Sequence, residues 1–477
     1  MQKTVENKSY YKWLTFSVVA CAIFMATLSA SIVAVSLPII TIATVSDLST
    51  AQWVISAYLL VITSTLPLCG RLGDIYGRRR VYIFGFVGFV AGSLLCGLAQ
   101  SMEGLIAARL LQALGASPLI ANSPAIVTSG FPEKERGKIL GLNGAVVALG
   151  TLTGPSVGGL LIEHFSWNII FFINIPFGLL GLLGAYLLLP LDGKALMESI
   201  DYVGAVLFSI AMTSLLLVIN LGGQWGWSSA RVFISFLFIA VFFGMFLRRE
   251  KRTPFPMMDL SMFKNRSFLV DTISCSLSYM ALFANTILTP FYLHTALGFP
   301  PAQIGLVMSA SPLVMVVTAP LSGRMSDKIG SRKLTTVGLG IMAAGLYYMG
   351  HLDSTSSLPQ IIWGQVITAF GNGLFQAPNN SSIMSSVSPG QRGIAGGINA
   401  LARNFGMVSG TAIAVSVFDH TRLSCLAGVI SPDAAQELRA IILGYEDAFF
   451  VAVLVALAGV AISMTHRGHT ATAKSGG

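Results

Sequence analysis

Charge is scarce in this chain. Aspartate, glutamate, lysine and arginine together make up 10% of its 477 residues, whereas hydrophobic residues make up 54%. Water-soluble domains carry about 25% charged residues. Because so few charges cannot cover the surface of a water-soluble protein of this length, we expect lipid to surround most of the chain.

Other features are also missing. The five cysteines form no C-x-x-C pair, so the sequence predicts neither a disulfide framework nor a zinc site. It contains no G-x-x-x-x-G-K-[ST] motif and no soluble stretch long enough for a nucleotide-binding domain, which excludes an ATP-driven pump. The six histidines fall in predicted loops or in the tail, so we expect no enzyme active site, no bound metal and no cofactor. A weak metal site at His466 and His469 is the alternative to a simple polar tail.

The net charge of +9 does not indicate nucleic-acid binding. Its basic residues come in short clusters between long apolar runs, as at 78–80 and 248–252, rather than on one folded face. The first apolar run, from Trp13 to about Ile40, is too long for the core of a signal peptide and predicts a membrane-spanning helix.

Fourteen apolar segments have the length of about 20 residues that a bilayer-spanning helix needs. The predicted spans cover roughly 14–40, 51–69, 81–99, 104–129, 139–161, 168–190, 202–220, 231–248, 267–291, 302–322, 334–351, 359–386, 395–418 and 443–464. An even number puts both termini on one side, and a cytoplasmic placement leaves most of the 29 lysine and arginine residues inside. The longest outer loop is then 419–441. The prediction is an all-α polytopic protein of the bacterial cytoplasmic membrane with cytoplasmic termini.

An internal repeat divides the chain. Residues 70–80 read GRLGDIYGRRR and residues 323–333 read GRMSDKIGSRK, each directly after a second hydrophobic span. Duplicated helical bundles are common in transporters. We therefore predict a six-helix bundle over 1–190, two inserted helices with a basic linker over 191–266, and a second six-helix bundle with a tail over 267–477.

The first of these repeated segments resembles the loop 2–3 signature of the major facilitator superfamily. The residues that carry it and its repeat are Gly70, Asp74, Gly77, Arg78, Arg79, Gly323, Asp327 and Gly330. The resemblance implies a conformational latch, in which the aspartate pairs across helices and the arginines hold the carboxyl ends of neighbouring helices. An anchor that only fixes topology is the alternative.

The fifth span resembles the antiporter motif of drug exporters in that family. The residues concerned are Gly150, Gly154, Pro155, Gly158 and Gly159, which predict close helix packing and a kink. The run 167–176 resembles the sixth span of the fourteen-span drug:proton antiporter group, which usually has arginine where Asn168 stands. The resemblance implies transport that is driven by the proton gradient.

Charged residues inside the spans are candidates for the transport pathway. Arg109 lies in the fourth span with Gln112 one turn later, a pattern that resembles the family motif linked to proton transfer. A lone intramembrane charge is costly, so we expect Arg109 to face a wet cavity. Arg403 is a second candidate, with snorkelling as its alternative. Asp271 is the candidate proton carrier, or else an interfacial charge.

The first span departs from the family pattern. Ser29 stands where the resembling motif usually has aspartate, and the first half has no acidic residue at mid-membrane depth. A desolvated dication would need such a carboxylate. The sequence therefore favours an anionic, zwitterionic or neutral small molecule. Proton-coupled efflux of drug-like compounds is the main prediction, and proton-coupled uptake of a bulky metabolite, such as riboflavin or a bile acid, is the alternative.

Overall fold

The computed structural model describes residues 11–132, 135–190, 201–226, 228–253, 260–388, 391–427, 429 and 432–465. Within these ranges all regular secondary structure is helical. The first helices are α2 (Tyr11–Ala43), α3 (Leu48–Ala51), α4 (Trp53–Tyr76), α5 (Arg78–Leu98), α6 (Met102–Ser129), α7 (Arg136–His164), α8 (Ile169–Phe172), α9 (Asn174–Leu188), α10 (Tyr202–Trp225) and α11 (Ala230–Glu250). They are followed by η2 (Leu260–Lys264), α12 (Arg266–Thr295), α13 (Pro301–Ile329), α14 (Ser331–Gly350), α15 (Leu358–Ser385), α16 (Arg392–Leu426) and α17 (Ala434–Met464).

Each predicted span overlaps a long helix, and the second and sixth spans also include a short helix, α3 or α8. In the described part of the chain, 12 helical segments are long and apolar enough to cross a membrane. Helices α14 and α15, with 20 and 28 residues, are long enough but too polar to be among them. This shows a multi-span helical protein, whereas the count of fourteen stays a prediction.

Most of the predicted outer loop 419–441 is helical, and its place outside the membrane stays a prediction. Helix α16 continues to Leu426, and α17 already begins at Ala434. A capping box explains the early start, because Asp433 accepts from the Gln436 amide while the Gln436 side chain accepts from the Asp433 amide. Polar residues start this helix, so the apolar pattern alone misses its first turns.

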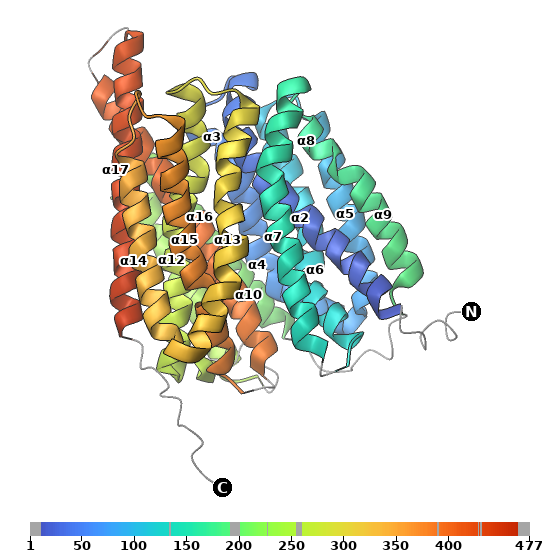
Figure 1. Ribbon diagram of the computed structural model, residues 1–477. Coiled ribbons are helices and arrows are strands. Elements are labelled where there is room, and N and C mark those ends of the chain that lie inside the picture. Colours follow the sequence, from blue (N-terminus) through green and yellow to red (C-terminus); the bar gives the residue numbers. More distant parts are fainter. Residues whose placement is uncertain are drawn as a thin grey trace. The chain divides into compact units, whose positions relative to one another are not determined.

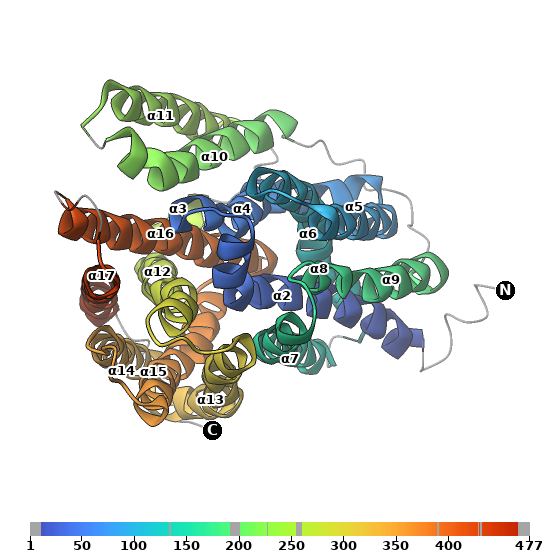
Figure 2. The same ribbon diagram turned by 90° about the horizontal axis from the view of Figure 1, so that it is seen from above.

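The chain divides into two compact units. Unit 1 comprises Met1–Met257, Thr286–Ser309 and Thr411–Asp419, and unit 2 comprises Met258–Asn285, Ala310–Gly410 and His420–Gly477. In unit 1, α10 and α11 pack side by side and α10 contacts α4 (Figure 2). In unit 2, α14 lies against both α15 and α17 (Figure 1). The predicted division at 190/191 and 266/267 stays a prediction.

The repeat seen in the sequence is also present in the structure. Helix α4 ends at Gly77, with φ 94°, and α13 ends at Gly330, with φ 85°, and a new helix starts directly after each glycine. Residues that have a side chain rarely adopt a positive backbone φ, so both tight corners need glycine. The two units therefore share one local design for joining their second and third long helices.

Glycines also allow a close helix approach in each unit. A Cβ atom on Gly115 of α6 would meet the backbone of Phe89 in α5, and one on Gly371 of α15 would meet the backbone of Met342 in α14. Backbone cannot move aside as a flexible side chain can. Small residues at such crossings are what allows membrane helices to pack closely.

We predict that Gly115→Ala and Gly371→Ala each destabilise the protein by roughly 1–3 kcal/mol, because the added methyl group forces packed helices apart. Gly144→Ala and Gly340→Ala are the controls, since a Cβ atom at either position has nothing within 4 Å. These controls should be neutral, or stabilising by up to about 1 kcal/mol through helix propensity. Thermal unfolding of the purified protein in detergent measures all four, and equal melting temperatures would contradict the packing argument.

Candidate functional site

Arg109 is the most deeply buried charged side chain of α6, with 1% of its surface exposed. Its Nη1 atom donates to Ser29 Oγ at 3.2 Å and to Gln112 Oε1 at 2.5 Å, and its Nε atom donates to the Val54 carbonyl at 3.0 Å. The partners come from α2, α4 and α6. We predicted that Arg109 faces a wet cavity, and in the structure its partners are protein groups.

Aromatic rings complete the surroundings of the guanidinium. Its central carbon lies 4.0 Å from the centroid of the Tyr58 ring and 5.9 Å from that of Phe171. The negative face of an aromatic ring attracts a cation, most strongly where water is excluded. Tyr58 therefore stabilises the charge although its hydroxyl has no hydrogen-bond partner in the described part of the chain.

Gln112 is held in turn by a neighbouring helix. Its Nε2 atom donates to Ser93 Oγ of α5 at 2.7 Å, which leaves its oxygen facing Arg109. A Cβ atom on Gly92 would meet the Gln112 backbone, so the glycine allows α5 to come this close. The amide is thus fixed from both ends, and it positions the guanidinium.

Arg109 has only neutral partners. Ion pairs in the described part of the chain include those of Lys12 with Glu135, Arg78 with Asp74, Arg249 with Asp201 and Arg422 with Glu437, and Arg109 takes part in none of these four. A buried charge is normally paired, since removing it from water costs several kcal/mol even after relaxation. Ser29, at the position where the resembling motif has aspartate, contributes a hydroxyl in place of a carboxylate. The unit therefore holds an uncompensated positive charge.

The other two candidate charges both lie in unit 2. Asp271 of α12 is 4% exposed, and Arg403 of α16 is half-buried. The Cys275 side chain interacts electrostatically with both of them, and the Tyr279 hydroxyl bonds to Arg403 and to Gln376. The sequence named Asp271 and Arg403 separately, because nothing in it shows that both act on Cys275.

The predicted latch residues Arg78 and Arg79 make helix-end contacts in unit 1, and Arg332, which the prediction did not name, makes a similar contact in unit 2. Arg78 pairs with Asp74 at 2.9 Å and also donates to the Ala125 carbonyl at 3.4 Å. Arg79 donates to the Tyr186 carbonyl near the end of α9, and Arg332 donates to the Met464 carbonyl at the end of α17. Both sit one residue into the helix that follows the positive-φ glycine.

Three further residues of the predicted latch are Gly70, Gly323 and Asp327. A Cβ atom on Gly70 or Gly323 would make only an ordinary contact of 3.9 Å with an alanine methyl group, so neither glycine marks a tight crossing in this structure. The predicted site residue Asp327 lies in α13, but its side chain is outside the part of the chain that is described.

The glycines of the antiporter-like motif pack α7 against α2. Added Cβ atoms on Gly150, Gly154 and Gly158 would meet Thr27, Ser31 and Ile32 in that order. A further bond runs from Ser31 Oγ to the Gly150 carbonyl at 3.1 Å. Gly159 faces the backbone of Pro301, within unit 1, and Pro155 lies inside a helix that continues to His164.

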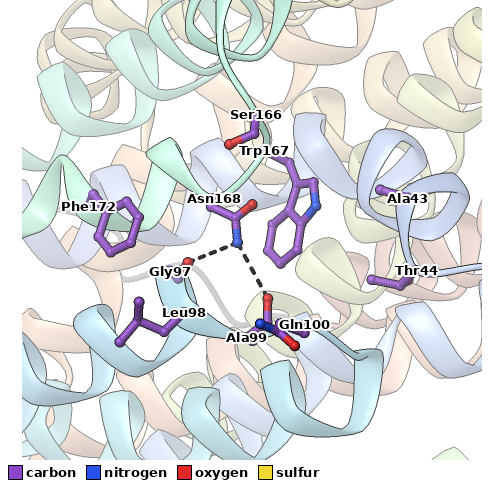
Figure 3. Close-up of a pocket in the computed structure, with 10 residues that line it drawn as sticks. All are labelled: Ala43, Thr44, Gly97, Leu98, Ala99, Gln100, Ser166, Trp167, Asn168 and Phe172. Carbon is purple, nitrogen blue, oxygen red and sulfur yellow. Dashed lines mark hydrogen bonds between the residues drawn. The ribbon is translucent and has the colours of Figure 1, made fainter.

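An open cleft of about 510 Å³ lies where α5 ends and α8 begins (Figure 3). Asn168 projects into it and donates to the carbonyl groups of Gly97 at 2.8 Å and Ala99 at 3.4 Å. Its lining residues are all neutral, and none belongs to the Arg109 network. The cleft therefore offers no charge with which to hold a ligand.

Comparisons with known proteins agree with this architecture. The family described as Major Facilitator Superfamily matches residues 19–411 and 272–468. "Riboflavin transporter RibZ" of Clostridioides difficile is 37% identical over 85% of this chain and 88% of its own length. "Multidrug resistance protein Stp" of Mycobacterium tuberculosis is 31% identical over 85% of this chain and 75% of its own length.

Solved structures show the same fold. A bacterial homologue of the human lysosomal transporter Spinster, in its inward-facing and occupied conformation, superimposes with a TM-score of 0.70 at 14% identity, covering 96% of this chain and 97% of that one. These findings confirm the predicted family and the predicted class of function. The chain belongs to the Major Facilitator Superfamily and is a multi-pass transporter of the cell membrane.

Proposed function

We propose that the protein takes up a neutral or anionic planar ring compound of the flavin type. The transport uses fourteen spans with cytoplasmic termini and is driven by protons moving down their gradient. The observation that carries the proposal is the buried guanidinium of Arg109, which is held by neutral oxygens and an aromatic ring.

Electrostatics disfavour a cationic substrate. At an effective dielectric constant of about 20, two like charges about 8 Å apart repel by about 2 kcal/mol. Arg109 exerts this repulsion on any cation nearby, because Ser29 supplies no carboxylate to cancel it. An anion or a neutral ring with electron-rich carbonyl groups experiences attraction instead.

The riboflavin transporter among the relatives supports this substrate class. Riboflavin has a planar ring system that is neutral at pH 7 and carries several carbonyl acceptors. Riboflavin fits a site that has the positive charge of Arg109 and no carboxylate beside it.

Export of drug-like compounds is the second candidate. The glycines that resemble the antiporter motif do pack α7 tightly against α2, and several relatives are named as multidrug resistance proteins. The lack of a carboxylate beside Arg109 argues against cationic drugs as the exported compounds, so neutral drugs would be the substrates of such an exporter.

Asp271 is the proposed proton carrier. It is a buried carboxylate in α12 whose neighbourhood includes Cys275 and Arg403. A buried acid that exchanges its proton near a fixed positive charge can couple proton movement to a change of conformation.

Uptake can be tested in a bacterial strain that neither makes nor imports riboflavin and that lacks its main efflux pumps. Expression of the chain should restore riboflavin accumulation, and a protonophore should abolish it. Arg109→Gln should lower the rate at least about ten-fold, because losing a buried charged hydrogen-bond donor costs more than 1.4 kcal/mol. Membrane quantities of the variant are measured alongside by immunoblot.

The opposite result would establish the second candidate. If riboflavin does not accumulate, but the cells retain less of a neutral fluorescent drug until a protonophore is added, the protein is an exporter. Wild-type rates for Arg109→Gln in either assay would contradict the role of the buried charge.

The missing carboxylate gives a separate prediction about stability. Ser29→Asp should stabilise the protein by roughly 1–3 kcal/mol, since it pairs a charge that is already buried. In an Arg109→Ala background the same substitution should destabilise, because an isolated buried carboxylate has no partner. Thermal unfolding of the four proteins in detergent completes the cycle. An identical shift in both backgrounds would show that residue 29 and Arg109 do not interact.

A further inference from the structure

One face of α15 is lined with amides. Thr368 and the amide residues Gln365, Asn372, Gln376 and Asn379 are three or four residues apart, the spacing that places side chains on a single helix face. Gln365 is 0% exposed, and Asn372 and Asn379 are each 1% exposed. We call these five residues the amide stripe. Its polarity is one reason why α15 is less apolar than the 12 helical segments that could cross a membrane.

The N-terminal part of the stripe forms hydrogen bonds with α12 and α13. Gln365 and Asn285 exchange two amide hydrogen bonds, of 3.0 and 3.2 Å, and Ser311 donates to Gln365 Oε1 at 2.6 Å. Further along, Gln376 donates to the Tyr279 hydroxyl. The stripe therefore faces α12 and α13 inside unit 2, rather than the lipid.

Two amides of the stripe are not satisfied. Three of their atoms lack a hydrogen-bond partner among the described residues: Nδ2 and Oδ1 of Asn379, and Oδ1 of Asn372. The Asn372 nitrogen has only the thioether sulfur of Met315, at 3.3 Å, which is a weak acceptor. Each buried polar atom without a partner costs about 1–3 kcal/mol, and such atoms are rare unless they serve a ligand or water.

The repeat shows that the stripe replaces a charge. Arg109 lies six residues before Gly115, and Gln365 lies six residues before Gly371, the glycine that makes the equivalent contact. Tyr58 and Ser311 likewise stand twelve residues before Gly70 and Gly323. At matching places, unit 1 holds a guanidinium over a ring, whereas unit 2 holds a neutral amide bonded to a hydroxyl.

We infer that the amide stripe binds the neutral ring amide or imide of the transported substrate, an inference that rests on the proposed function. Asn372 and Asn379 together present both donors and acceptors without charge. An anion would need donors alone and a cation acceptors alone. A ring imide offers a carbonyl, an N–H and a second carbonyl along one edge, which matches the mixed set.

Binding to the purified full-length protein tests this inference apart from transport. The probes are lumichrome, a neutral flavin ring with a free imide, and its N3-methyl derivative, in which the imide donor is blocked. We expect lumichrome to raise the melting temperature of the wild-type protein and to bind about ten-fold more tightly than the methyl derivative, the effect of one hydrogen bond. Asn372→Leu and Asn379→Leu should bind both probes equally weakly.

The same variants separate a ligand role from a structural one. Leucine has a similar size and removes unsatisfied atoms, so without ligand both variants should melt at or above the wild-type temperature. Asn220→Leu is the matched control, because Asn220 of α10 is also buried, at 7% exposure, and also has an amide oxygen without a partner in the described residues. It should discriminate between the probes as the wild-type protein does.

The outcomes distinguish the two hypotheses. If wild-type protein discriminates between the probes and the leucine variants do not, the stripe binds the imide even if riboflavin uptake fails in cells. If riboflavin is taken up but the variants keep the wild-type discrimination, the proposed function stands and the stripe is only structural. If lumichrome does not stabilise the wild-type protein, or if its N3-methyl derivative binds equally well, the inference is overturned.

Discussion

A positive charge that is buried without a negative partner constrains the rest of unit 1. A carboxylate would normally stabilise such a buried guanidinium, but Arg109 is stabilised instead by fixed dipoles and aromatic rings. This stabilisation comes from Ser29 of α2, from Val54 and Tyr58 of α4, and from Gln112 of α6. Since each contribution is short-ranged, the three helices have to stay in register to within a fraction of an ångström.

The packing of the unit supplies that register. Gly92 lets α5 approach α6 closely enough for Ser93 to hold Gln112, and the glycines of α7 bring that helix directly against α2, which carries Ser29. The small residues and the charge are therefore parts of one design. Without the close crossings the neutral oxygens would lie too far from the guanidinium to compensate for its desolvation.

The two halves of the repeat differ in an instructive way. Both units keep the positive-φ glycine at the helix corner and an arginine that donates to a carbonyl near the end of another helix, Arg79 to α9 in unit 1 and Arg332 to α17 in unit 2. At the matching central position one unit has Arg109 and the other Gln365. Residues that shape the helix corners are therefore repeated, whereas the central polar residue is not.

The sequence predicted the helices well because each span needs only local information, a run of about 20 apolar residues. It missed the start of α17, since the capping residues Asp433 and Gln436 are polar and look like a loop. It identified Ser29 and Arg109 as unusual, but their hydrogen bond joins residues that are 80 positions apart, and no periodic pattern reveals such a contact. The sequence alone does not identify the amide stripe, because the common face of polar residues within a helix gains meaning only when its neighbours are known.

Helices α10 and α11 depend on the same constraint. Asp201 caps the first turn of α10 and forms an ion pair of 2.9 Å with Arg249 near the end of α11. This ion pair joins the start of α10 to the end of α11. Ser209 donates to the Ser64 carbonyl and Thr213 to the Ser64 hydroxyl, so the pair is bonded to α4. Helix α4 also supplies Val54 and Tyr58 to Arg109. Polar bonds inside a membrane have no water to replace them. Helices α10 and α11 therefore support the helix on which the buried charge depends, and these bonds explain why the pair belongs to unit 1 rather than forming a unit of its own.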